Sequence, residues 1–318
     1  MSTMPKITVG FCTYNRADSL PGLVHVLRGL SCPYPFEILV VNNNSRDHTS
    51  KVLDELANEP GAPLRWVMET EQGIVPARNR LITETLDQDY LLMLDDDELP
   101  GPEWLAAGLD ALHSEGAQCV SGPITVDFRT ISAPNWMNAG IRGFLGEVDY
   151  GPDAYWNTHP SQRFYTGNIG YCLSLFREHP ELRFDTRYNR AGEGIGGGSD
   201  THMYGRMLEM GVRLRYRPEM LIYHHVDTWK LKRSYFLRLH HREGVRIGRY
   251  STTDYVRSVL GVPPFMLAQA LRHSAKALGM TLRGDQEFLR QGMNATHAWG
   301  MVRGLYLRRR DRQEKEVR

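Results

Sequence analysis

The chain has 318 residues and a formal net charge of +1, and 41% of its residues are hydrophobic and 24% charged. This composition is typical of a globular protein, and the length is enough for one large domain and a smaller appendage. No stretch approaches the ~18 consecutive apolar residues of a membrane span, and no signal-type apolar segment follows Met1, so we expect a cytoplasmic protein. The scattered cysteines exclude a zinc knuckle and fit free thiols in a reducing compartment (Cys12, Cys32, Cys119 and Cys172).

The first hundred residues alternate short β-rich runs with segments of helical spacing. Strands are predicted at 7–11, 36–41, 64–69 and 90–94, and helices at 18–30, 45–56 and 76–86. Such alternation predicts an α/β fold, a mainly parallel sheet with helices on both faces. Ligands bind such sheets at the carboxyl ends of the strands, where three polar runs converge (13–15, 42–44 and 95–97). No G-x-G-x-x-G follows the first strand, which argues against a dinucleotide-binding fold.

Three consecutive carboxylates follow the predicted strand at 90–94. If that strand continues, Asp95 and Asp97 face one way and Asp96 faces the other. Burying like charges is unfavourable unless positive charge lies among them. Two carboxylates suit Mg²⁺ or Mn²⁺, whose remaining positions phosphate oxygens can fill. The run therefore predicts a metal and diphosphate site, and the alternative is a solvated acidic turn.

A second carboxylate centre is predicted at Asp200. A glycine-rich run at 194–198 leads into Ser199, a good helix N-cap, and places Asp200 in the first turn of a helix that ends at Met210. This arrangement indicates a fixed carboxylate beside a mobile loop. The alternative is that the helix dipole alone favours an acid at this position.

Aromatic residues are dense between the two carboxylate centres, from Trp136 to Tyr165, with little periodicity. This favours a loop that stacks on the faces of sugars, although aromatic side chains are more often part of a core. On the predicted strand that ends near residue 226, His224 and His225 are consecutive, so only one of them can face the site. We take His224 as a candidate third metal ligand, and the alternative is a structural histidine.

Taken together, these residues resemble the family 2 glycosyltransferases with the GT-A fold. The matching motifs are Thr13-Tyr14-Asn15-Arg16, Asn42-Asn43-Asn44, Gly73-Ile74 with Ala77-Arg78-Asn79, Asp95-Asp96-Asp97, Thr166-Gly167-Asn168, Gly198-Ser199-Asp200-Thr201-His202 and His224-His225-Val226. They extend to about residue 250. The resemblance implies a GT-A catalytic domain at 1–230, with a donor-binding half at about 1–100 and an acceptor-binding half at about 101–230.

The resemblance also implies an inverting, metal-dependent transfer from a nucleotide-sugar donor, expected to be a UDP-sugar, in bacterial-type surface polysaccharide or glycoconjugate synthesis. Its donor-binding residues would be Thr13, Tyr14, Asn15, Arg16, Asn42, Asn44, Arg78, Asp95 and Asp96. Mg²⁺ or Mn²⁺ would be held by Asp95, Asp97 and His224. A saccharide or lipid-linked acceptor would contact Trp136, Thr166, Gly167 and Asn168. Asp200 would be the catalytic base.

Two positions depart from the family pattern. Asn42 stands where the family usually has Asp, so a neutral amide replaces the acidic partner of a uracil N–H and weakens the assignment of the base. Ser199 stands where the family usually has Glu, and Glu193 is a conceivable substitute. The rival functions are a sugar-nucleotide nucleotidyltransferase, a metal-dependent phosphohydrolase and a non-catalytic carbohydrate-binding protein. The first of these lacks its basic, glycine-rich phosphate loop here.

The charge is divided unevenly along the chain. Residues 1–229 carry 19 Lys/Arg against 30 Asp/Glu, whereas residues 230–318 carry 19 against 7. We therefore expect a basic helical extension at 231–318, with apolar and cationic residues mixed at 264–282 and 305–310, which suits an anionic membrane surface with a lipid-linked acceptor. The alternatives are packing on the catalytic body, a homodimer contact or a solvated helix. No nucleic-acid partner is expected, because no zinc-finger or aromatic RNA-binding pattern is present.

Overall fold

The chain folds into two compact units. The computed structural model describes residues 4–129, 131–189, 198–252, 255 and 257–316. The first unit comprises Met1–Ser132 and Ala139–Val226, and the second comprises Ala133–Asn138 and Asp227–Arg318. The second unit thus begins a few residues before the boundary predicted at 230, and it includes a short segment from the middle of the chain.

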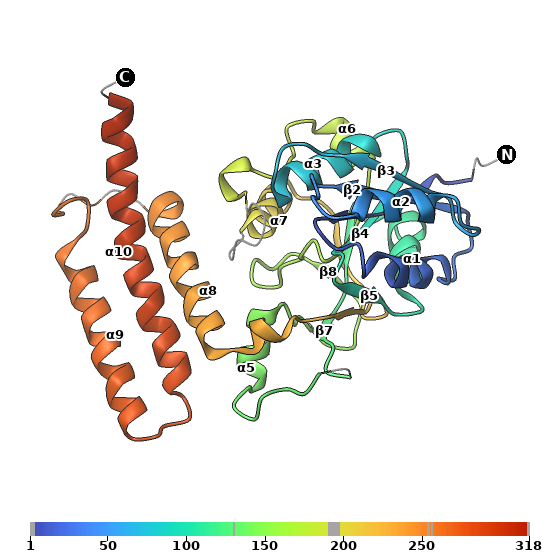
Figure 1. Cartoon of the computed structure of the whole chain (residues 1–318). Coiled ribbons are helices and arrows are strands. Elements are labelled where there is room, and N and C mark those ends of the chain that lie inside the picture. The colour runs from blue at the N-terminus through green and yellow to red at the C-terminus, as the bar shows by residue number, and fades with distance from the viewer. Residues whose placement is uncertain (1–3, 130, 190–197, 253–254, 256, 317–318) are drawn as a thin grey trace. The chain divides into compact units, whose positions relative to one another are not determined.

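The first unit is built on an eight-stranded sheet in the order β3-β2-β1-β4-β9-β6-β10-β8. Figure 1 labels β2, β3 and β4 of this sheet together with α1, α2 and α3. The strands are β1 (Ile7–Thr13), β2 (Phe36–Asn42), β3 (Leu64–Met68), β4 (Tyr90–Leu94), β6 (Cys119–Ser121), β8 (Tyr155–Asn157), β9 (Asn168–Cys172) and β10 (Leu214–Tyr216). The first four are parallel to one another, β10 is parallel to β6, and β9 runs antiparallel to both of its neighbours. The predicted mainly parallel α/β sheet is confirmed.

Helices cover both faces of this sheet because its central strands are apolar on both sides. In β2, Ile38 and Val40 pack into one core cluster with α1 and α2, while Leu39 and Val41 pack into the other with α3 and α7. The helices of this unit are α1 (Leu20–Arg28), α2 (Thr49–Ala57), α3 (Ile74–Glu84), α4 (Trp104–Leu109), α5 (Ala139–Arg142), α6 (Ser174–Glu178) and α7 (Ser199–Glu209), with short turns at Asp110–Ser114, Gly143–Leu145 and Thr186–Tyr188.

A second, three-stranded sheet brings a distant histidine beside the aspartate run. Its order is β5-β11-β7, with β5 at Glu98–Pro100, β7 at Ile124–Val126 and β11 at Ile222–His224. In this sheet His224 stands opposite Glu98 in register. The backbone N–H of His225 also donates to the carbonyl of Asp97, at 2.8 Å. The pairing therefore fixes the end of β11 next to the turn that follows β4.

The second unit is a set of helices, which confirms the predicted helical C-terminal extension. Its elements are α8 (Arg233–Arg246), α9 (Pro264–Leu282) and α10 (Phe288–Glu316), with turns at Thr228–Leu231 and Ile247–Ser251. Glycines allow α8 and α10 to approach closely, since a Cβ at Gly244 would collide with the backbone of His297 and one at Gly300 with that of His241. Within the described residues, no helix is both long and apolar enough to span a bilayer.

Candidate active site

The loops after β1 and β2 are locked to each other at the carboxyl edge of the sheet. The backbone N–H of Asn15 donates to Oγ of Ser45 at 2.9 Å, and the Asn15 carbonyl oxygen Oδ1 accepts from the N–H of Arg46 at 2.8 Å. Asn15 and Asn44 have positive φ angles of 53° and 56°, a conformation that asparagine tolerates well. Tyr14 is half-buried beside them. These predicted donor-binding residues thus form one rigid edge.

Asn42 and Asn43 are buried supports of this edge. Asn42 has no exposed surface, and its amide accepts from the N–H of Ser45 at 3.1 Å and donates to Oγ of Ser50 at 3.0 Å. Asn43 accepts from the N–H of Gly73 at 2.8 Å and so ties the loop after β2 to the start of α3. Because the Asn42 amide is enclosed, the predicted contact with a base would require this turn to open.

The three aspartates diverge, and this corrects the expected strand alternation. β4 ends at Leu94, so the aspartates occupy a turn in which each side chain follows its own direction. Asp96 accepts from Oγ1 of buried Thr13 at 2.7 Å. Asp95 turns toward Arg78, and Asp97 turns toward Arg16 and His224.

Asp97 lies between a cation and an imidazole. Its Oδ2 atom is 3.7 Å from Nη2 of Arg16 and 3.6 Å from Nε2 of His224. The Nδ1 atom of His224 lies 2.8 Å from the carbonyl oxygen of Leu145, which can only accept, so Nδ1 carries the hydrogen of this bond and Nε2 is the nitrogen that faces Asp97. Metal-binding histidines are oriented by such a bond.

This pair fits a divalent cation. Two ligands each about 2.1 Å from an ion, at angles of 90–120°, lie about 3.0–3.6 Å apart, which is the separation of Asp97 and His224. Among the described residues no three His, Cys, Asp or Glu side chains form a ready ligand set. A cation here would therefore need further ligands such as phosphate oxygens. Asp95, the third predicted ligand, is instead bonded to Arg78.

Arg78 joins the two predicted carboxylate centres. Its side chain, 7% exposed, donates from Nη2 to Asp95 at 3.1 Å and from Nη1 to Asp200 at 2.8 Å. Burial alone would lower the pKa of Arg78, but the charges of Asp200 and Asp95 outweigh this and raise it. The guanidinium is therefore a permanent cation between the carboxylates. α3 positions it from a start at Gly73, whose φ of 139° favours glycine.

Asp200 is held from a second side by Thr166. Oγ1 of this buried threonine donates to Oδ1 of Asp200 at 2.6 Å, the oxygen that Arg78 also contacts. Among the described residues the other oxygen, Oδ2, has no hydrogen-bond partner. α7 begins one residue earlier than predicted, after Gly198 with a φ of 113°, so Asp200 lies in its first turn. Glu193 lies outside the described residues.

The other predicted acceptor residues are placed differently. Asn168 is fully buried and binds the indole N–H of Trp104 and two backbone carbonyls, a structural position. Gly167 lies against the carboxyl group of Glu98, where any side chain would collide. Trp136 belongs to the second unit and packs edge-on against Phe236, with 5.8 Å between ring centroids. Their contact with an acceptor stays a prediction.

The turn also contains carboxyl groups whose pKa is raised. Burial and the neighbouring charge of Asp97 raise the pKa of Asp96 to about 7. Burial, Asp95 and Asp97 hold the pKa of Glu98 well above its usual range, and Glu98 accepts from the N–H of Asp95 at 2.8 Å. A cation at this turn would relieve the repulsion and favour the ionised forms.

A cavity of about 400 Å³ brings Asp95, Asp200 and His224 to one surface. It is lined by Asp95, Glu98, Ile124, Gly143, Gly146, Glu147, Val148, Asp149, Tyr150, Tyr165, Thr166, Gly167, Asp200 and His224. The acidic members Glu98, Glu147 and Asp149 were not among the predicted site residues. Only Glu98 carried a signal, because it directly follows the aspartate run.

The comparison with protein families decides the family of the chain. The model of Glycosyl transferase family 2 matches residues 8–179, more than half of the chain. The chain belongs to glycosyl transferase family 2. The predicted family and its GT-A type fold are therefore confirmed, and the matched region contains Arg78, the aspartate turn and Thr166.

A curated relative and solved structures are also similar to the chain. The glycosyltransferase AglE of Haloferax volcanii is 24% identical over 176 residues, which cover 55% of the chain and 53% of AglE, so the chain spans about half the length of that relative. A mannosyltransferase from Pyrobaculum calidifontis, solved with GDP-Man and Mn²⁺, has a TM-score of 0.61 at 18% identity and covers 96% of the chain and 88% of its own. Residues 1–349 of TarS from S. aureus, solved with UDP, have a TM-score of 0.53 at 15% identity, covering 95% of the chain and 91% of TarS.

Proposed function

We propose that the chain transfers a sugar from a nucleoside diphosphate donor to a hydroxyl group of an acceptor, with inversion at the anomeric carbon. The observation that carries this proposal is the buried Arg78 bridge between Asp95 and Asp200, two carboxylates that line one cavity. The bridge connects a place for the leaving diphosphate with a place for the attacking hydroxyl. A binding protein would not need this pairing.

Asp200 is the proposed base. Its Oδ1 atom is fixed by Arg78 and Thr166, which leaves Oδ2 to accept the proton of the acceptor hydroxyl. The acceptor oxygen forms a bond to the anomeric carbon as the bond from that carbon to the diphosphate oxygen breaks. No covalent glycosyl-enzyme is formed, so the configuration inverts.

Asp97 and His224 are the proposed holders of Mg²⁺ or Mn²⁺. Asp95 is the proposed further ligand, and its carboxylate would then contact both the cation and Arg78. When bound, such a cation neutralises the charge that develops on the diphosphate. Arg16, 3.7 Å from Asp97, and Arg78 supply permanent positive charge at the same turn. The Mn²⁺ of the P. calidifontis mannosyltransferase supports this assignment.

The donor is proposed to be a UDP-sugar, with a GDP-sugar as the alternative. UDP in TarS and GDP-Man in the P. calidifontis enzyme support a nucleotide donor and leave the base open, as does Asn42. The acceptor is proposed to be a saccharide, free or lipid-linked, in the synthesis of a surface polysaccharide or glycoconjugate. Cytoplasmic action fits the four free cysteines of the structure.

Binding and turnover together test the proposal. Calorimetry with UDP and with GDP, each with and without Mn²⁺, should show metal-dependent binding of one nucleotide. Asp97→Ala and His224→Ala should weaken it, Asp96→Ala should weaken it less, and Asp87→Ala at the opposite end of the sheet should leave it unchanged. Equal, small effects at all four positions would contradict the metal assignment.

Chromatography separates the rival functions. With nucleotide sugar and a panel of saccharide acceptors, a transferase releases nucleoside diphosphate only when an acceptor is present. A phosphohydrolase releases nucleotide without acceptor, and a binding protein releases none. NMR of the product should show an inverted anomeric centre, and a retained one would contradict single displacement by Asp200.

A further inference from the structure

The outer face of α9 presents a continuous apolar stripe. Leu267, Leu271, Leu278 and Leu282 recur at helical spacing and are 37, 59, 62 and 79% exposed. Pro264 and Ala275 extend the same face and are exposed as well. On the other side of the helix Met266 and Ala270 are buried, so α9 already has its packing partner within the second unit. The exposed leucine face therefore needs a different packing partner.

Positive charge borders this stripe on one side. Arg272, Lys276 and Arg283 are exposed and follow one another along the neighbouring surface of the helix. α9 contains no Asp or Glu. Two copies of this face would bring like charges together, which disfavours a symmetric contact. An anionic surface would complement it.

An aromatic residue of α10 borders the stripe as well. The indole N–H of Trp299 donates to Oγ of Ser274 in α9 at 3.0 Å, and 38% of Trp299 is exposed. Tyr306 lies on the same face of α10, two helical turns later, and is 46% exposed. Tryptophan and tyrosine with one apolar and one polar side are enriched where a protein meets lipid headgroups.

We propose that α9 lies flat on an anionic lipid surface, with Leu271 and Leu278 at the centre of the inserted face and Arg272 and Lys276 at the headgroups. A helix with one leucine face and one cationic border binds in the plane of a membrane interface. Near such a surface each cation contributes about 1 kcal/mol, so binding should fall steeply as salt rises. This role is independent of the proposed sugar transfer.

Flotation of the full chain with vesicles tests the proposal. The chain should float with vesicles that contain phosphatidylglycerol at low salt and should remain unbound with pure phosphatidylcholine. L271D/L278D should abolish flotation, and R272Q/K276Q should weaken it about tenfold or more, as expected for two lost cations. K51E is the matched control, because it also changes the net charge by −2 but lies on α2 of the first unit, where the Lys51 side chain is 78% exposed.

Two further measurements accompany the flotation, and the results that would overturn the proposal follow them. Circular dichroism should show that each variant keeps the helix content of the wild type. The fluorescence of Trp299, isolated by comparison with W299F, should shift to shorter wavelength only with the anionic vesicles. No flotation at low salt, or an equal loss in K51E, would refute the assignment. If light scattering shows a dimer that L271D/L278D converts to a monomer without any lipid binding, the stripe is instead a contact between copies.

Discussion

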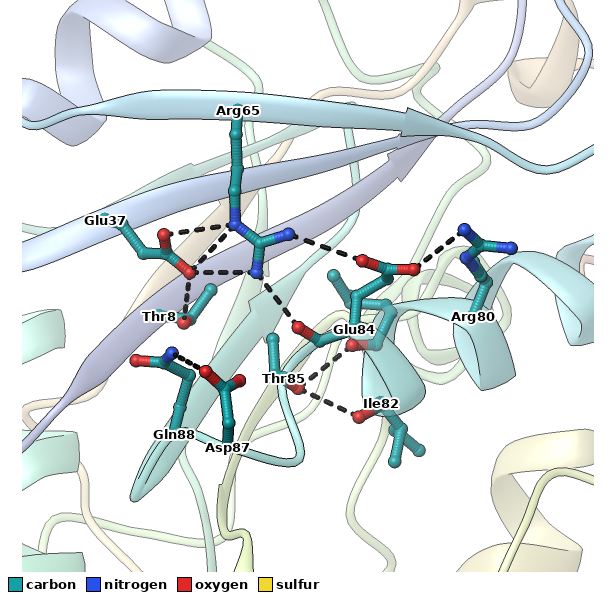
Figure 2. Close-up of polar contacts among 10 residues, drawn as sticks. Thr8, Glu37, Arg65, Arg80, Ile82, Glu84, Thr85, Asp87 and Gln88 are labelled. Carbon is teal, nitrogen blue, oxygen red and sulfur yellow. Dashed lines mark hydrogen bonds and ion pairs between the residues drawn. The ribbon is translucent and has the colours of Figure 1, made fainter.

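Two arginines of the first unit each bridge two carboxylates, at opposite ends of the same parallel strands. Arg65, near the start of β3, contacts Glu37 of β2 at 3.1 Å and Glu84, the last residue of α3, at 3.5 Å (Figure 2). Arg78, near the start of α3, bridges Asp95 and Asp200 at the other end. The two networks have the same chemistry, and α3 takes part in both.

The two networks differ in the exposure of the arginine side chain and in what its carboxylate partners face. The Arg65 side chain is 37% exposed, and Glu37 also accepts from Oγ1 of Thr8 at 2.9 Å, as Figure 2 shows. The Arg78 side chain is 7% exposed, and its two partners line the cavity. A solvated arginine bridge ties strands together, whereas a buried one that opens on a cavity holds charge ready for a ligand. Exposure therefore separates the structural network from the one that we propose to be catalytic.

The largest expected effect follows the proposed base. Asp200→Asn keeps size and the bonds to Thr166 and Arg78 but removes the proton acceptor, so turnover should fall on the order of 10²–10⁴ while donor binding stays nearly unchanged. Glu84→Gln makes the same change in the Arg65 network and should leave turnover intact. Single-turnover kinetics and nucleotide binding measure both. A variant at Asp200 that kept most of its turnover would move the base elsewhere.

The arginines themselves give the next largest effect. Arg78→Met removes a buried cation from two ion pairs and should impair transfer and lower the free energy of unfolding by about 2–3 kcal/mol, since water reaches the Asp95 and Asp200 side chains, which are 39 and 24% exposed. Arg65→Met should lower it by about 1 kcal/mol or less, because water already screens that pair. Urea denaturation compares the two. Equal losses would show that exposure does not separate the networks.

The sequence was sufficient for the framework of the first four parallel strands and for the place of Asp200 in the first turn of α7. The strands and the order of the motifs predicted which residues meet at the carboxyl edge, because parallel strands bring their ends together. The strand end at Leu94 was predicted correctly, but the divergence of Asp95 and Asp97 in the turn after it was not, because it depends on the partners that the rest of the fold brings to each side chain. Nor did the sequence single out Arg65, whose role appears only when β2, β3 and the end of α3 are adjacent.

Other features depended on tertiary contacts that no local pattern encodes. Asn168 matched the acceptor motif, yet in the structure its amide is consumed by Trp104 and two backbone carbonyls. Glu98 enters the cavity because β5 pairs with β11, which comes from more than a hundred residues later. The helical extension was predictable from charge and spacing, but the approach of α8 and α10 through Gly244 and Gly300 was not.

A smaller effect should appear as a pH dependence at the site end of the sheet. The pKa of Asp96 is raised to about 7 by burial and Asp97, above its value of about 4 in an unfolded chain, so the folded state binds more protons between these values. Without divalent cations, stability should therefore fall as pH rises from about 4 to 7. Asp96→Asn should remove about 1–3 kcal/mol of this fall. Urea denaturation across this range checks it, and a parallel decline in both proteins would assign the pH dependence to another group.

The smallest effect compares two buried threonines, one in each network. Thr166 donates to Asp200 at 2.6 Å and Thr8 donates to Glu37 at 2.9 Å, and both are almost fully enclosed. Thr166→Val should lower turnover about fivefold, because one hydrogen bond that orients the base is worth about 1 kcal/mol. Thr8→Val should leave turnover unchanged and lower the free energy of unfolding by a similar amount. Turnover and urea denaturation of both variants decide this, and a loss of turnover in Thr8→Val would mean that the Arg65 network also reaches the site, through α3.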